Sequence, residues 1–118
     1  MAYLLIVREP RGQRAERNEE AGAQIYQSML NYGADLAKRG ILVAAESLRD
    51  DSHGVRISIR EGKTVLVDGP FTESKEMIGG FFLLDFSRQE EAIELARQCP
   101  AVKFATIEIR ELAPCNTP

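Results

Sequence analysis

Four ionisable side chains lie close together in the sequence, between two segments that are typical of β-strands. Asp68 ends a β-branched run, and Glu73, Lys75 and Glu76 follow it after a Gly-Pro turn. A carboxylate on the rigid end of an apolar strand is suited to general-base chemistry, because burial would tune its proton affinity. Charged residues on the more mobile turn are suited to the rim of a ligand site. Asp68 is therefore the candidate general base, and Glu73, Lys75 and Glu76 are candidate ligand-binding residues that form a rim or gate.

Each of these residues also has a purely structural interpretation. The carboxylate of Asp68 would equally well cap the following turn by accepting its backbone amides, and a cap does not exclude a base. Glu73, Lys75 and Glu76 on one short turn are also typical of a solvated surface. The sequence leaves both alternatives open.

The other residues of this segment have structural interpretations. Gly69-Pro70 predicts a sharp turn off the strand, and Phe71 is typical of a core residue. Gly79-Gly80 predicts the end of a short helical turn over residues 72–78 and a close approach of two backbones.

Other chemistries lack their sequence signatures. The chain contains no nucleophile elbow, phosphate-binding glycine loop or dinucleotide fingerprint. Its single histidine, His53, lies in an Asp/Ser/Gly-rich turn, where an exposed and uninvolved side chain is expected. Cys99 and Cys115 have no CxxC spacing and are expected to be free thiols. The sequence therefore predicts no metal site and no cofactor.

Composition places the chain among ordinary globular domains. Its 118 residues carry a net charge of −3 with acids and bases interspersed, so a nucleic-acid partner is not expected. No apolar run approaches the ~18 residues of a membrane span, and the short apolar N-terminus is not typical of an export signal. We expect a single cytoplasmic domain over residues 1–118, with a flexible tail at 113–118.

The order of predicted elements indicates a ferredoxin-like fold. Strands are expected at residues 3–8, 41–48, 80–86 and 104–112, and a helix fits residues 18–39. A capping box, Ser87 with Glu90, opens a second helix that ends near Gln98. An alternating pair at residues 55–68 predicts a β-hairpin. Without that hairpin the order is β-α-β-β-α-β, so we predict an α+β, split β-α-β fold with an inserted hairpin.

The apolar pattern of the strands also predicts a partner. Two helices cover only one face of a four-stranded antiparallel sheet, and the other face should then be polar. The runs at residues 4–7, 41–44 and 81–84 are instead apolar on both faces. A second copy of the chain is the economical cover, so we expect a homodimer in which two sheets pack face to face as a dimeric α+β barrel.

Residues 62–81, GKTVLVDGPFTESKEMIGGF, carry a family resemblance. This segment resembles the DGPF-domain branch of the YCII-related family, and the segments 3–6, 40–48 and 90–100 also match that family's pattern. The resemblance implies a dimeric α+β barrel, in agreement with the face pattern. It also implies that some relatives are enzymes with a His–Asp pair in a cleft of the barrel. This chain departs from that pattern, because its first predicted helix carries no histidine.

Two classes of function follow from these observations. An apolar barrel interior with carboxylates and arginines at its mouth suits the binding or transformation of a small apolar organic acid or an aromatic or lactone-like molecule. The alternative is a non-catalytic accessory or regulatory domain whose dimer presents a surface.

Overall fold

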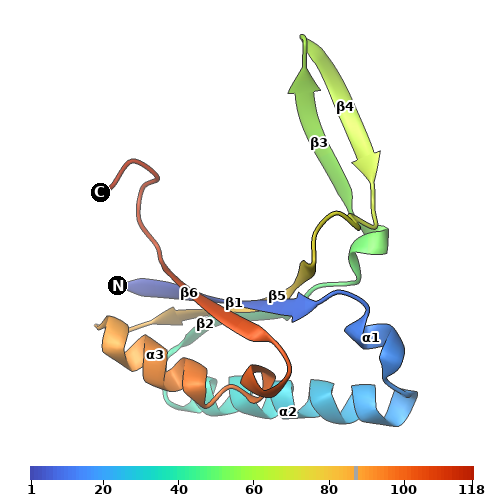
Figure 1. Ribbon diagram of the computed structural model, residues 1–118. Coiled ribbons are helices and arrows are strands. Elements are labelled where there is room, and N and C mark those ends of the chain that lie inside the picture. The colour runs from blue at the N-terminus through green and yellow to red at the C-terminus, as the bar shows by residue number, and fades with distance from the viewer. Residues whose placement is uncertain (87) are drawn as a thin grey trace.

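The structure of the chain, a computed structural model, describes residues 1–86 and 88–118. It consists of one sheet, two long helices, a separate hairpin and short helical turns (Figure 1). The elements in chain order are β1 (Ala2–Pro10), α1 (Gln13–Glu16), α2 (Glu19–Lys38), β2 (Leu42–Ser47), η1 (Asp51–His53), β3 (Val55–Arg60), β4 (Lys63–Asp68), β5 (Glu76–Asp85), α3 (Gln89–Arg97), η2 (Pro100–Lys103) and β6 (Thr106–Glu111).

The main sheet has the strand order β2-β5-β1-β6, and every neighbouring pair is antiparallel. The helices α2 and α3 cover one face of this sheet (Figure 1). The β3–β4 hairpin forms a second sheet of its own between β2 and β5 in the chain. The predicted α+β, ferredoxin-like fold with an inserted hairpin is therefore confirmed.

Local signals explain the bounds of the long helix α2. The Asn18 side chain caps its start by accepting a hydrogen bond from the Ala21 amide at 2.8 Å. Gly40, just past its end, has a φ of 72°, a conformation that glycine adopts without strain. Tyr32 and Leu36 are buried on its inner side. None of the helices in the described part of the chain is long and apolar enough to cross a membrane.

The core lies between the helices and one face of the sheet. Leu5, Leu36, Leu84 and Cys99 are fully buried there. The Tyr32 hydroxyl donates to the Leu95 carbonyl at 2.6 Å, so the polar end of this buried ring is satisfied. This bond ties α2 to α3 on the helix side of the sheet.

The opposite face of the sheet, which we call the open face, is apolar at its centre. Leu4 is paired with Leu83, and Ile6 with Phe81, across β1 and β5. All four side chains are only half-buried within one protomer. The central strands are therefore apolar on both faces, as the sequence predicts. The second copy of the chain that this pattern predicts as a cover for the open face stays a prediction.

Two features of the central strands differ from the sequence-based expectation. β5 begins at Glu76 rather than at residue 80, and no helical turn spans residues 72–78. The reason is that β1 continues to Pro10, where Glu9 pairs with Met77 and Pro10 pairs with Glu76. The predicted capping serine, Ser87, lies outside the described residues.

Glycine at position 69 is required by a close backbone approach. A Cβ built on Gly69 would lie 1.7 Å from the Asp51 carbonyl oxygen, whereas a Cβ on Gly22 would have nothing within 4 Å. We predict that Gly69→Ala lowers the free energy of unfolding by more than about 3 kcal/mol, because backbone cannot yield as a side chain does. Gly22→Ala, in the interior of α2, should instead raise it by about 0.5–1 kcal/mol. Urea denaturation checks both, and equal effects would contradict this packing argument.

Candidate functional site

The first residues of β5 separate two hollows on opposite sides of the sheet. The larger hollow lies between α2 and the sheet, has a volume of about 770 Å³, and is called the helix-side groove. The smaller one, about 370 Å³, lies where the hairpin meets β1 and β5 and is called the hairpin-base hollow. Both are built in part from the 68–81 segment that carries the candidate residues.

The helix-side groove is apolar along most of its length and charged at one end. Its apolar wall includes Ile25 and Met29 of α2 and Phe82 of β5. At its polar end lie Glu9, Arg14, Arg17, Asn18 and Glu19. A concave apolar pocket with a few convergent polar groups is the usual form of a small-molecule site.

An ion pair between Glu9 and Arg14 closes the polar end of the groove. Glu9 is only 6% exposed, and its Oε1 accepts from Arg14 Nε at 2.6 Å. Arg14 Nη2 also lies 3.4 Å from Glu9 Oε2 and from the Gly79 carbonyl oxygen. Because a buried carboxylate is costly without a partner, Arg14 is what allows Glu9 to stay at this position.

The short turn between β1 and α1 delivers Arg14 to this place. Gly12 has a φ of 87°, which a residue with a side chain rarely adopts, and it turns the chain from the end of β1 into α1. Arg14 therefore returns over the strand that carries Glu9, five positions earlier in the chain.

The glycine pair of the motif makes room for this site. A Cβ on Gly79 would lie 2.1 Å from Glu9 Oε2, so the Glu9 carboxylate occupies the space of the missing side chain. A Cβ on Gly80 would lie 2.7 Å from the Glu46 carbonyl oxygen, which brings β2 close to β5. The expected close approach of backbones is thus present at Gly80, whereas at Gly79 the glycine accommodates a charged side chain.

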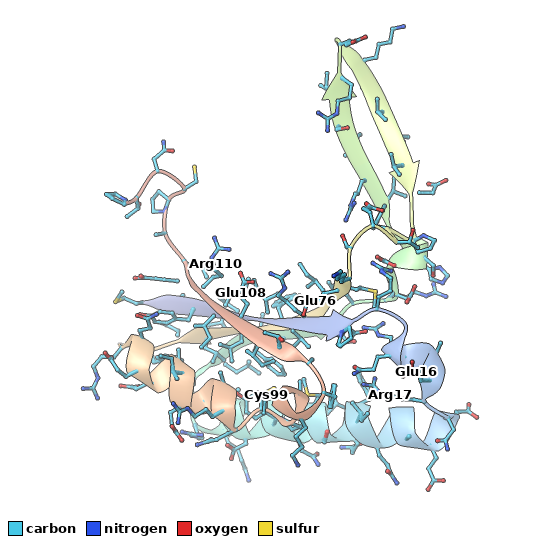
Figure 2. All side chains as sticks on the ribbon, viewed as in Figure 1. Glu16, Arg17, Glu76, Cys99, Glu108 and Arg110 are labelled. Atoms are coloured by element: carbon cyan, nitrogen blue, oxygen red, sulfur yellow. The ribbon has the colours of Figure 1, made fainter. Side chains whose placement is uncertain are left out.

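Arg17 is the second cation at the polar end (Figure 2). Its guanidinium Cζ lies 4.8 Å from the centroid of the Phe104 ring, and Nη2 donates to Gln13 Oε1 at 2.7 Å. The Gln13 side chain is itself held by the Phe104 carbonyl, which accepts from Gln13 Nε2 at 2.8 Å. Gln13 is the one acceptor that the described residues provide for Arg17, which leaves most of its five donors available to a ligand.

The hairpin-base hollow is organised by a second ion pair. Arg11 donates from both terminal nitrogens to the Asp51 carboxylate, at 2.9 and 2.6 Å. Its Nε donates to the Ser74 carbonyl at 2.8 Å, so one guanidinium joins η1 to the loop before β5. The hydrogen bonds from Arg11 lower the pKa of Asp51 below its usual value.

Two further arginines of this hollow are also paired. Arg56 stacks over the Phe71 ring at 3.9 Å and donates to Glu73 at 2.6 Å. Arg8 donates to Glu76 at 3.1 Å and to Glu108 at 2.6 Å. The three arginines of the hollow, Arg8, Arg11 and Arg56, therefore meet four carboxylates, so their positive charge is already balanced and the hollow is not suited to an anion.

The residues predicted from sequence occupy the rim around the hairpin base, but they do not form one cluster. Asp68 ends β4 with an exposed side chain, lines neither hollow, and its carboxylate accepts no hydrogen bond from the described residues. Glu73 pairs with Arg56, and Lys75 is exposed while its carbonyl accepts the Arg11 amide at 2.9 Å. Glu76 lines the hairpin-base hollow on the open face (Figure 2).

Sequence reasoning missed Glu9, Arg14 and Arg17. Glu9 shares its strand face with Leu5 and Val7, at spacings of two residues, so its burial was readable from the alternation. The predicted strand ended at Arg8, and this signal was lost. Arg14 and Arg17 carry no such signal, because a turn and tertiary contacts position them.

His53 is exposed at the end of η1 and lines neither hollow. Within residues 1–86 and 88–118 no three potential metal ligands of the His, Cys, Asp or Glu type gather in one place. Cys99 is buried and Cys115 exposed, and both are free thiols. The groups of these two hollows that could transfer a proton are therefore carboxylates and, in the helix-side groove, the Tyr26 hydroxyl.

The fold and its two hollows define a ferredoxin-like α+β domain with space for a small molecule. The family model of the YCII-related domain matches residues 1–116, and the chain belongs to this family. An uncharacterised protein of Rhizobium meliloti (strain 1021) is 41% identical over 54 residues. That match covers 44% of this chain and 44% of the relative, so the chain spans less than half of the relative's length.

A solved structure with the same fold is that of 5-chloro-2-hydroxyhydroquinone dehydrochlorinase (TftG) from Burkholderia phenoliruptrix, in complex with 2,5-dihydroxybenzoquinone. The TM-score is 0.56 at 14% sequence identity, and the alignment covers 96% of this chain and 94% of that one. At this identity the similarity concerns the fold.

The Arg11–Asp51 pair should make stability sensitive to acid. The pKa of Asp51 is lower in the folded state than in the unfolded state, where it is about 3.9. The contribution of Asp51 to the free energy of unfolding is therefore present above the unfolded-state pKa and is lost as the pH falls through the folded-state pKa. We predict that Asp51→Asn lowers the free energy of unfolding at pH 7 and reduces its further loss between about pH 5 and pH 2. Asp35→Asn, which removes an exposed i,i+4 pair with Arg39, is the control and should change little. An unchanged acid dependence in Asp51→Asn, measured by urea denaturation, would refute the assignment.

Proposed function

We propose that the protein binds a small, largely apolar molecule with an acidic group, of the aromatic, quinone or lactone-like kind, in the helix-side groove. The observation that carries the proposal is a groove of about 770 Å³ that is apolar along α2 and β5 and ends in two arginines and a buried carboxylate. A groove of this volume is in the range of ligand sites, about 300–1,000 Å³.

The polar end supplies complementary roles for such a ligand. Arg17 retains donors for a carboxylate, an enolate or a phenolate, and an arginine recognises such planar anions through paired hydrogen bonds. Glu9 would accept a hydrogen bond from a hydroxyl of the ligand, while Arg14 holds that carboxylate in place by its own hydrogen bonds. The apolar wall would hold the ring by burial of its surface.

The groove is proposed to operate within a homodimer. Its support is the open face, where Leu4, Ile6, Phe81 and Leu83 form an apolar surface on the side of the sheet without helices. Two such faces packed together would give the dimeric α+β barrel, with a helix-side groove in each protomer. The GKT…DGPF…GGF segment supports placement in the DGPF-domain branch of the family.

Asp68 remains a separate proposal for the same class of ligand, with Glu73, Lys75 and Glu76 as its gate. It lines neither hollow of one protomer, so it would reach a ligand only in the assembled dimer. Its exposed carboxylate accepts no hydrogen bond from the described residues, so Asp68→Asn should change the free energy of unfolding by no more than about 0.5 kcal/mol.

We predict that Arg17→Gln weakens binding of 2,5-dihydroxybenzoquinone or salicylate at least about tenfold, because a charge-assisted hydrogen bond contributes about 1.5–3 kcal/mol. Isothermal titration calorimetry measures the dissociation constants, and nuclear magnetic resonance of the ligand reports any conversion. Arg39→Gln is the matched control, since Arg39 caps the opposite end of α2 and pairs only at the surface. Its affinity should equal that of the unaltered protein.

The same titration decides between the two locations. Weaker binding in Arg17→Gln with unchanged binding in Asp68→Asn supports the helix-side groove and removes Asp68 from the site. Weaker binding in Asp68→Asn alone moves the site to the barrel mouth. If neither probe binds at millimolar concentration, or if both variants bind as tightly as the unaltered protein, the proposed function is wrong.

A further inference from the structure

The β3–β4 hairpin stands away from the body of the protomer, on the side of the sheet opposite to the helices (Figure 1). Among the residues that the structure describes, its strands pair only with each other. An isolated two-stranded hairpin is at best marginally stable in water, because it has too little surface to bury. Something beyond the protomer is therefore needed to hold it in this extended form.

One face of the hairpin is largely apolar and exposed. The strand register sets Ile57 opposite Leu66, with Val55 and Ile59 on the same face of β3, and Asp68 and Thr64 on that face of β4. The exposed fractions are 59% for Val55, 70% for Ile57, 72% for Ile59 and 64% for Leu66. A contiguous apolar patch of this kind is uncommon on a monomer and marks an interaction surface.

The other face of the hairpin differs in character. Arg56, Ser58 and Arg60 alternate with the apolar residues of β3, and Val67, Val65 and Lys63 lie opposite them on β4. This second face is therefore mixed, with three cations, one serine and two valines. The first face carries the larger side chains and the higher exposed fractions, so it is the one that a partner is expected to cover.

The accessible surface area of the protomer is larger than that of a compact chain of the same mass, and the difference indicates how much surface a partner could cover. Its accessible area is 8355 Å². A compact chain of this mass would expose only roughly 6,400 Å², so the excess is roughly 1,900 Å². Its radius of gyration, 16.2 Å, likewise exceeds the value of about 13.5 Å for a compact chain of this length. A stable dimer needs only about 800 Å² from each partner, which the excess more than supplies.

We propose that the hairpin is an arm that clasps a second copy of this chain through the face formed by Val55, Ile57, Ile59 and Leu66. Packed sheets lie about 10 Å apart, whereas six residues of strand extend about 20 Å. A hairpin that rises from the open-face side therefore passes the partner's sheet and reaches its helix layer. In a two-fold dimer each protomer contributes one arm, and the arms lock the face-to-face packing of the sheets.

This inference rests on the proposed dimer and not on the proposed ligand. The test is Ile57→Lys, whose new charge lies in the middle of the apolar face and diagonal to Asp68, so the hairpin itself is not opposed by like charges. Ser58→Glu is the matched control, because it adds a charge of similar size on the opposite face, between Arg56 and Arg60. Analytical ultracentrifugation over a dilution series gives the dimer dissociation constant of each.

The expected result is a dimer for the unaltered protein, a dissociation constant at least about a hundredfold higher for Ile57→Lys, and no change for Ser58→Glu. A dimer that Ile57→Lys leaves intact overturns the arm while the face-to-face dimer stands. An unaltered protein that is monomeric at micromolar concentration overturns both, and neither result alters the ligand titration with Arg17→Gln.

A second measurement needs no variant. Hydrogen exchange of the amides of residues 55–68 in the unaltered protein should slow as the concentration rises through the dissociation constant, because the arm is held only in the dimer. Exchange that is fast at every concentration, in a sample that sedimentation shows to be dimeric, would contradict the arm.

Discussion

The carboxylate of Glu9 occupies the space that a side chain at position 79 would fill, and much of the molecule is arranged around that contact. Because Gly79 has no side chain, β1 and β5 stay paired past the irregularity between Val7 and Arg8 and continue to Pro10 and Glu76. The longer pairing carries the charged segment onto the sheet. Arg14 then neutralises Glu9, and the buried charge becomes the polar end of an apolar groove.

The same strand end organises the other side of the sheet. Arg11, directly after β1, holds Asp51 through two hydrogen bonds and the Ser74 carbonyl through a third. Gly69 fits against the Asp51 backbone at a distance that no Cβ tolerates. A single arginine thus fixes where the chain leaves the sheet for the hairpin and where it returns. The rigidity of this base is what gives the hairpin a defined direction away from the protomer.

Alternation and end signals were enough to predict the fold. The apolar patterns of the strands and of residues 18–39, with the alternating pair at residues 55–68, gave the α+β order and the inserted hairpin correctly. The site was predicted only in part, for a physical reason: Arg11 meets Asp51 across 40 positions and Arg14 meets Gly79 across 65, and no local pattern reports such contacts. Glu76 lines a hollow because it begins β5. The Gly79-Gly80 pair predicted a helical turn, which is absent, and a close backbone approach, which is present at Gly80; the buried carboxylate that Gly79 accommodates has no local signal.

The two apolar surfaces of the protomer call for one explanation rather than two. The open face and the hairpin that carries the second apolar surface both lie on the side of the sheet without helices (Figure 1). A partner that covered the open face alone would leave the apolar face of the hairpin exposed to solvent. A partner that covered the hairpin alone would leave the open face of the sheet exposed. A second copy related by a two-fold axis would cover both, because its sheet would pack on the open face while the hairpin of each protomer lies against the other protomer. Polar residues at the edges of the open face, such as Arg8, Glu108 and Arg110, pair within one protomer and so cost little to bring to the rim of such an interface.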